Sequence, residues 1–410
     1  MRRRFTLAIY FACCCSLVFP NSIFSADWVF SPSISLREEY DSNVLFSSQD
    51  EQDDFVTSIR PVFSLIGETE KTRFRLDPAF KIQKYLENSS LDDIHYDINA
   101  TLTQRVSERF SADFSSHFLK DSTLETQLEQ AGVRTQRAER YGFDFGLGET
   151  YALSERMSIS AKESVGTVLY PDGEFPDTRF LLLEAGLAYQ LSPRDTARFS
   201  ATYSTTDYDF SPNERRSAEI STLQEMIIWE RELNETTSMS LGAGHRKTWS
   251  ESSRPELVFD PERLAFRTVK KESVSSDDGT VFLAFLRKAW SERFSTVLSA
   301  GKEQYSNVDA TSLDRTYAGL EVSYRISELT TFASTLRYDH NKETGAGNQE
   351  IDYVRFVPSI EWKLTEHSAL RFAGSYEHEH RTGLGLARDA DRFKAWIEFV
   401  YWWPRFGENR

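Results

Sequence analysis

The feature that most constrains this fold is an alternation of apolar and polar side chains, which recurs along the chain from residue 28 onward. In one such segment the apolar residues Phe356, Ile360 and Trp362 occupy even-numbered positions, whereas the charged residues Arg355 and Glu361 occupy odd-numbered ones. Successive side chains of a β-strand point to opposite faces of a sheet, so each segment predicts a strand with one apolar and one polar face. The chain is therefore expected to consist almost entirely of amphipathic strands.

The length of these segments separates two kinds of β protein. Each alternating stretch covers about 10 to 17 residues, whereas the strands of soluble sandwiches are usually about 5 to 6 residues long. A strand that crosses a membrane needs about 9 to 11 residues. The segment length favours a transmembrane barrel over a soluble sandwich.

Short polar turns and longer polar connections alternate between the predicted strands. Seven of the turns share an apolar residue followed by a hydroxyl or amide side chain, and an eighth precedes them: 67–72, 106–110, 153–157, 191–195, 233–237, 290–294, 326–330 and 364–368. The longer connections are rich in Asp, Glu, Ser, Asn and Gly: 40–53, 86–92, 119–137, 170–178, 207–217, 250–277, 305–314, 340–350 and 379–390. Short turns at one end and long loops at the other are typical of bacterial outer-membrane barrels.

These turns also predict the number of strands. Eight short turns, with both chain termini on the same side as the turns, give an antiparallel up-and-down barrel of about 18 strands with short periplasmic turns and long extracellular loops. Closure of the barrel removes exposed strand edges. The segment 124–140 has a helical composition, and the sequence leaves open whether it folds toward the lumen as a helix or extends the strands beyond the membrane.

The N-terminus predicts export. Three arginines at positions 2–4 are followed by an apolar stretch over 5–19 and by Ala26, an arrangement typical of a signal peptide over residues 1–26. The barrel is then expected over 27–410. All three cysteines, at 13–15, lie in the signal peptide, so the exported chain is expected to contain no disulfide.

Composition excludes several other classes of protein. No run of 18 or more apolar residues occurs after the first 25 positions, which excludes a bundle of membrane-spanning helices. The aromatic content of 13% is too high for a disordered chain, and the net charge of −15 argues against a nucleic-acid partner. The sequence predicts no catalytic residue, no cofactor and no metal site. His378 and His380 are the densest candidate ligands, and they are expected to be a loop edge facing solvent or lipopolysaccharide.

Charged residues of the polar parity are expected to line the lumen. Both signs occur among the predicted lining residues: Arg60, Arg73, Arg75, Lys81, Asp97, Arg105, Asp144, Glu163, Arg325, Arg337, Arg355, Glu361, Arg371, Lys394 and Glu398. A lining of mixed charge suits a hydrated pore for polar solutes, although pairs of opposite charge could also brace the wall.

Several short motifs are similar to those of a known family. The start at Asp27-Trp28, the segment Tyr40-Asp41-Ser42-Asn43-Val44-Leu45 and the repeated Leu-Ser-Glu-Arg turns resemble the putative beta-barrel porin type 2 family over nearly the whole exported chain. The resemblance implies an eighteen-stranded barrel in the outer membrane of a Gram-negative bacterium, associated with secretion of exopolysaccharide or capsule. It brings no catalytic residues.

The sequence therefore predicts a non-enzymatic outer-membrane channel for exopolysaccharide export. Its expected partners are outer-membrane lipid, lipopolysaccharide, a polysaccharide and periplasmic secretion components, and its oligomeric state is left open. A general or sugar-specific diffusion porin is the first alternative. The second alternative is a structural or adhesive barrel plugged by its loops, with 124–140 and 250–277 as candidate plugs.

Overall fold

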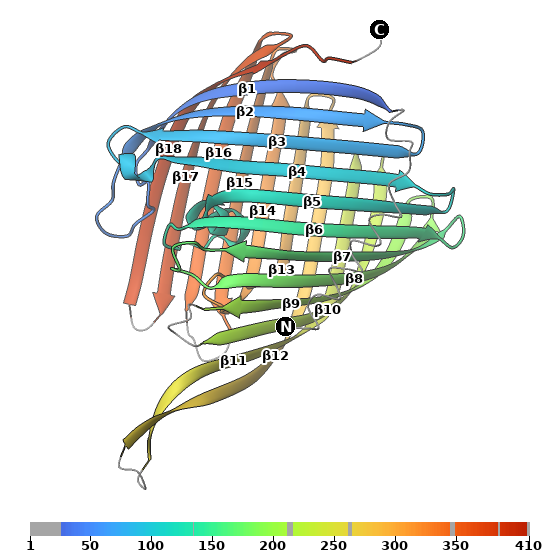
Figure 1. Cartoon of the computed structure of the whole chain (residues 1–410). Helices are drawn as coiled ribbons and strands as arrows, with labels where there is room; N and C mark the ends of the chain where they lie inside the picture. The colour runs from blue at the N-terminus through green and yellow to red at the C-terminus, as the bar shows by residue number, and fades with distance from the viewer. Residues whose placement is uncertain are drawn as a thin grey trace.

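The chain folds into a closed antiparallel barrel of 18 strands, as a computed structural model shows (Figure 1). The structure describes residues 26–133, 135–210, 216–260, 265–344, 349–383 and 386–407, so the predicted signal peptide lies almost wholly outside the described residues. Each strand pairs with its neighbours in sequence. The strands are β1 (Asp27–Asp41), β2 (Asp54–Glu68), β3 (Thr72–Tyr85), β4 (Asp93–Arg105), β5 (Phe110–Ser122), β6 (Glu139–Ala152), β7 (Met157–Leu169), β8 (Asp177–Ser192), β9 (Asp195–Asp209), β10 (Ser217–Asn234), β11 (Thr237–Asp260), β12 (Ala265–Ser291), β13 (Phe294–Ser306), β14 (Ser312–Arg325), β15 (Thr330–Glu343), β16 (Glu350–Thr365), β17 (Ser368–Gly383) and β18 (Leu386–Trp402). The predicted fold and strand count are confirmed.

The first and last strands close the barrel. β1 pairs with β18 from Ser33 opposite Trp402 to Asp41 opposite Lys394. Beyond the end of β18, the backbone amides of Phe30 and Phe406 each donate to the other residue's carbonyl at 2.9 Å. No strand edge is left open at this junction, which is what a barrel in a membrane requires.

The eight short turns share one hydrogen-bonding device. In the turn after β4, the Ser107 hydroxyl accepts the backbone N–H of Arg109 at 3.3 Å and of Phe110 at 3.1 Å. The same position is occupied in the other turns by a side-chain oxygen that accepts from the backbone two or three residues later: Thr69, Ser154, Ser192, Asn234, Ser291, Ser327 and Thr365. Ser, Thr and Asn stabilise tight turns in this way, which explains why the motif repeats.

The opposite end of the barrel differs from the prediction in two places. The predicted loop 250–277 is largely strand, because β11 and β12 pair as far as Asp260 opposite Ala265 and form a hairpin that projects beyond the barrel (Figure 1). The predicted loop 379–390 is also wrong, since β17 and β18 pair up to Gly383 opposite Leu386. Both stretches are polar because strands that extend beyond the membrane need no apolar face.

The two faces of the wall have different surroundings. Large apolar side chains are exposed on the outer face, among them Phe143, Leu187, Leu336, Phe356 and Phe393. Exposed apolar side chains in a continuous band are expected where the solvent is lipid. In the described part of the chain, no helix is long and apolar enough to cross a membrane.

Candidate pore constriction

A helix fills part of the lumen at the long-loop end. α2 (Thr123–Ala131) follows β5 directly, and it is visible as a teal coil behind β5 and β6 (Figure 1). Leu124, Leu128 and Ala131 recur at helical spacing and give α2 an apolar stripe. Gly132 ends the helix in the left-handed conformation, with φ +64°, and its N–H donates to the Leu128 carbonyl at 3.0 Å. Of the two structures left open for 124–140, the lumen-facing helix is the one observed.

Apolar side chains from distant strands hold α2 in place. Leu124 and Leu128 pack in a buried cluster with Phe46, Tyr353 and Ala390, which come from the β1–β2 connection, β16 and β18. A second cluster joins Ala131 and Val133 to Leu313 and Ile351 of β14 and β16. Since these contacts come from widely separated strands, α2 lies inside the barrel and not on its rim.

The C-terminal end of α2 is capped by side chains of β15. The Arg337 guanidinium donates to the carbonyls of Glu129 and Gln130, the latter at 3.1 Å. Asn341 Nδ2 donates to the carbonyl of Ala131 at 2.7 Å. The last carbonyls of a helix lack partners within the helix and carry partial negative charge, so a guanidinium at this position stabilises it.

The first turn of α2 is held by an ion pair with β18. The Glu125 carboxylate lies 3.2 Å from Arg392 Nη2 and 3.6 Å from Lys394 Nζ. Arg392 is only 1% exposed and also lies 3.3 Å from Glu377. Burial alone would raise the pKa of the Glu125 carboxyl, but the charges of Arg392 and Lys394 hold that pKa well below its usual range. The helix is therefore fixed at both ends by charged side chains of the wall.

This low pKa predicts how the constriction responds to acid. The cations facing Glu125 are Arg392 and Lys394 of β18, Lys81 of β3 and Arg355 of β16. The pKa of Glu125 is lower in the folded than in the unfolded protein. The ion pairs of Glu125 therefore stabilise the fold fully when the pH is above the ordinary pKa of a glutamate, and this stabilisation is lost as the pH falls through the lowered pKa. We expect single-channel conductance to be constant from neutral pH down to about pH 4 and to rise only below it. A conductance step near pH 6 that persists in Glu125→Gln would contradict this assignment.

Gly132 allows a test of the close packing between the end of α2 and Tyr353. A Cβ at this position would lie 2.6 Å from the Tyr353 ring, in addition to the strain of its positive φ. Gly173 has a similar φ of +67°, but nothing lies within 4 Å of its Cβ position. We expect Gly173→Ala to lower the free energy of unfolding by about 1–2 kcal/mol through strain alone. Gly132→Ala should cost measurably more in urea titrations of the refolded barrel, and equal costs would refute the contact with Tyr353.

The wall itself narrows the same end of the lumen. β12 pairs with β13 only as far as Phe282 opposite Lys302. Beyond this point, toward the long-loop end, β12 pairs with β11 alone. On the outer face of β13, Gln304 Oε1 accepts from the Thr222 hydroxyl at 3.1 Å and from the Thr248 hydroxyl, which both belong to the inner face of β10 and β11. At the long-loop end, β13 and β14 therefore lie closer to the barrel axis than β10 and β11.

The strand register shows where the predicted lining residues point. Fourteen of them share the face that contacts α2, namely Arg60, Arg73, Arg75, Lys81, Asp97, Arg105, Asp144, Arg325, Arg337, Arg355, Glu361, Arg371, Lys394 and Glu398. Their role as the lining of a conducting pore stays a prediction. Glu163 is the exception, because it lies between Leu147 and Leu183 on the outer face. Its placement in the lumen was wrong.

Only some of these residues come together at the constriction. Arg337 and Lys394 contact α2, and Arg355 lies 3.4 Å from Glu377 beside Arg392. Arg371 forms ion pairs with Glu361 at 2.7 Å and with Glu398 at 3.3 Å, away from the helix. Glu125 and Arg392 were missed by sequence reasoning. The parity of β18 would have placed Arg392 inside, but nothing in the sequence indicates that α2 supplies its partner.

The two candidate histidines face outward and pair with aspartates. His378 lies 2.9 Å from Asp391, and His380 lies 2.5 Å from Asp389. Within the ranges that the structure describes, no group of three or more His, Cys, Asp or Glu side chains is arranged to hold a metal ion.

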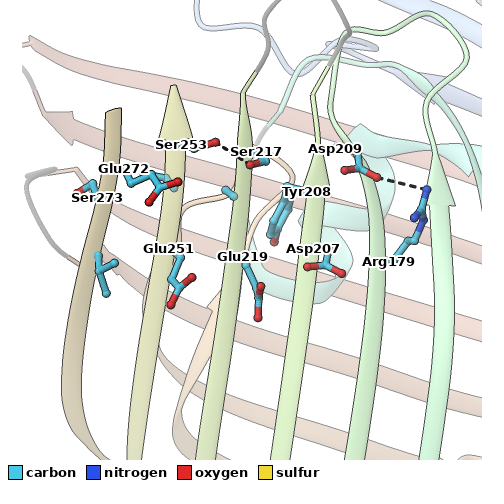
Figure 2. A pocket seen from close by; sticks show the side chains of 13 residues that line it. Arg179, Asp207, Tyr208, Asp209, Ser217, Glu219, Glu251, Ser253, Glu272 and Ser273 are labelled. Carbon is cyan, nitrogen blue, oxygen red and sulfur yellow. Dashed lines mark hydrogen bonds and ion pairs between the residues drawn. The ribbon is translucent and has the colours of Figure 1, made fainter. Parts of the chain in front are cut away.

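A row of acidic residues ends the apolar band of the outer face on the side of the long loops. Asp207, Glu219 and Glu251 are direct cross-strand neighbours on β9, β10 and β11, and Figure 2 shows them side by side. Arg179 of β8 completes the row and lies 3.3 Å from Asp209. Like charges on adjacent strands destabilise each other unless water or counter-ions surround them. This part of the wall therefore meets water or lipid headgroups and not hydrocarbon.

One family model matches the N-terminal half of the barrel. The profile described as "Putative beta-barrel porin 2" matches residues 25–223, which run from the start of β1 into β10. This stretch is similar to that family. The resemblance seen in the Tyr40–Leu45 segment and the turns is thereby confirmed, and the family is one of porin-like outer-membrane barrels. No curated protein is similar enough in sequence to match.

The solved structures that match this chain have very low sequence identity to it. The ferric-catecholate import receptor Fiu of E. coli K12 matches with a TM-score of 0.50 and 7% identity over 90% of this chain and 81% of its own. The outer membrane protein OpdK of Pseudomonas aeruginosa has a TM-score of 0.43 and 10% identity over 91% of this chain and 99% of its own. The likeness to Fiu shows the fold of a large β-barrel and no particular cargo.

Proposed function

We propose that the protein is a passive outer-membrane channel through which exopolysaccharide leaves the periplasm. The observation that carries this proposal is the inner wall between the short turns and α2. It is lined on several strands by small hydroxyl and amide side chains: Ser31, Ser33 and Ser35 on β1, Asn99, Thr101 and Thr103 on β4, Ser158, Ser160 and Ser164 on β7, and Ser200, Thr202 and Ser204 on β9.

Such a surface suits a sugar polymer that must slide through the barrel. Hydroxyl and amide groups exchange hydrogen bonds with sugar hydroxyls and with water at similar free energy, so a polymer is solvated along its path without being held. A lumen of 18 strands is wide enough to remain hydrated. Transport of this kind needs no catalytic step and no cofactor. The family resemblance supports the same cargo and implies periplasmic secretion components as partners.

Gene deletion tests the cargo. Loss of the gene should remove polysaccharide from the cell surface and leave uptake of small sugars unchanged, and the wild-type gene supplied in trans should restore it. A deletion strain that keeps its surface polysaccharide and takes up a sugar more slowly would instead support a diffusion porin.

α2 favours a second candidate, the barrel plugged by its loops. The helix contacts strands on both sides of the lumen through Arg140, Tyr305 and Arg392. If the plug never moves, the purified protein should pass no ions in a planar bilayer at any pH or voltage, and the protein would serve as a structural or adhesive barrel.

A further inference from the structure

We propose that the lumen beneath α2 is a binding site for the carboxylate groups of an acidic polysaccharide, and that Glu125 occupies this site in the resting channel. The inference rests on the proposed function and adds the charge of the cargo and the means by which the cargo opens the constriction. It follows from the distribution of charges around two adjoining cavities on the β1–β4 side of the lumen.

The first cavity lies next to α2 and is lined by cations and carboxylates. It has a volume of about 200 Å³. Its cations are Arg37, Lys81, Arg137, Arg355 and Lys394, and its carboxylates are Glu39 and Asp41 of β1 with Glu125 and Glu129 of the helix. Lys81 lies in the field of three other cations, Arg37, Arg60 and Lys394. Lys81 and Glu125 line the same cavity. The helix thus supplies one counter-ion for the wall cations, beside Glu39 and Asp41 of β1, which lie 3.7 and 3.5 Å from Lys394.

The second cavity continues the first toward the short-turn end. It has a volume of about 270 Å³ and shares Arg37, Ser58, Lys81 and His95 with the first cavity. It adds Arg60 and the carboxylates Asp97, Asp121 and Glu398, of which Asp121 pairs with Arg140 and Glu398 with Arg371. Lys81 and Arg60 lie on adjacent strands, β3 and β2. Neither side chain forms an ion pair with a carboxylate among the described residues, whereas the neighbouring Asp97 is bonded by His117 at 3.1 Å.

Unpaired cations also stand at the short-turn mouth. Arg73 and Arg105 line an open pocket there with Glu68, Glu70 and Glu108, beside the turns at 67–72 and 106–110. Among the residues that the structure describes, neither side chain has an ion-pair partner. A polymer entering from the periplasm would meet Arg73 and Arg105 first, then Arg60 and Lys81, and then the cations around Glu125.

The arrangement gives a reason for selectivity. Withdrawing Glu125 leaves the buried Arg392 guanidinium with Glu377 at 3.3 Å and Asp41 at 4.0 Å but one carboxylate fewer, which is unfavourable. A carboxylate of the polymer supplies the replacement, and a neutral sugar does not. Exchange of one carboxylate for the other would release the first turn of α2, while Arg337 and Asn341 keep its C-terminal end in place.

Single-channel recording with defined oligosaccharides tests the inference. The full-length exported chain, refolded in a planar bilayer, is exposed on the short-turn side to a hexamer of galacturonic acid or to the neutral maltohexaose. We expect the acidic hexamer to open a larger conducting state and maltohexaose to have no effect. Equal responses to the two oligosaccharides would overturn the inference.

Substitutions locate the effect. Glu125→Gln should hold the channel in the larger state without any oligosaccharide, whereas Glu125→Asp, which keeps a carboxylate, should restore the closed state. The double variant Arg60→Gln/Lys81→Gln should need about tenfold more of the acidic hexamer. Glu155→Gln, in an exposed turn, makes the same charge change and should behave like the wild type. A Glu125→Gln channel indistinguishable from the wild type, while still heat-modifiable as a folded barrel, would refute the role of Glu125.

The proposed function and this inference fail in different experiments. A deletion strain that keeps its surface polysaccharide would contradict the proposed function, regardless of the conductance measured in a bilayer. A protein that is needed for export but conducts equally with acidic and neutral oligomers removes only the inference.

Discussion

Replacing Arg392 by methionine should release the first turn of α2 and lower the free energy of unfolding by about 3–5 kcal/mol. The guanidinium is 1% exposed and serves both Glu125 and Glu377, and Glu377 is itself only 2% exposed. Removing one member of a buried ion pair leaves the other charge without compensation, which costs more than the pair contributed. Methionine preserves much of the side-chain volume over the Phe46 ring, so the loss would come from the charge.

Arg371→Met is the matched control for this experiment. Arg371 also bridges two carboxylates of the wall, Glu361 and Glu398, but it is 42% exposed and lies away from α2. We expect a cost of no more than about 1 kcal/mol for a pair so open to water. Urea unfolding of the refolded barrels and single-channel conductance should both separate the two variants. Equal destabilisation by both, with unchanged conductance, would contradict the role given to Arg392.

A charge on the lipid-facing side of the wall should have the second-largest effect. Leu336 and Thr335 are consecutive residues of β15, and Leu336 points outward while Thr335 points into the lumen, where it lies opposite Glu321. Leu336 is 43% exposed, which in this band means exposure to hydrocarbon. Arginine at a lipid-facing position near the bilayer midplane destabilises a barrel by about 2–4 kcal/mol.

Comparison of the two arginine variants tests the inside and outside faces directly. Leu336→Arg should unfold at lower urea concentration than the wild type in phospholipid vesicles, whereas Thr335→Arg should be close to neutral because it gains water and a carboxylate nearby. If Thr335→Arg were the more damaging variant, the assignment of faces would be inverted.

The barrel could be predicted from the sequence because its main determinants are local. Alternation fixes strand type and face over a few residues, and a Ser, Thr or Asn side chain fixes each short turn through bonds to the next two or three backbone amides. Glu163 shows the limit of this reasoning. Glu163 lies on the same face of β7 as Ile159 and Val165, so the apolar–polar alternation places its side chain outside the barrel. The prediction placed it inside because it is charged.

The constriction could not be predicted because its partners are far apart in the chain. Glu125 and Arg392 are separated by 267 residues, and Asn341 reaches Ala131 over 210. The composition of 124–140 was consistent with a helix, but its position depends on apolar contacts with Phe46, Tyr353 and Ala390, whose meeting follows only from closure of the barrel. The 250–277 hairpin was missed for a related reason, since its polar residues resemble a loop when no membrane faces them.

The most direct test of this account is the conductance of the channel with and without α2. Replacing Thr123–Ala131 by a Gly-Ser segment of equal length keeps the barrel and removes the helix together with its contacts to Arg392, Arg337 and Tyr353. We predict that the single-channel conductance of this variant in a planar bilayer exceeds that of the wild type by roughly twofold or more. Equal conductance of the two proteins would show that α2 does not constrict the pore and would contradict the account.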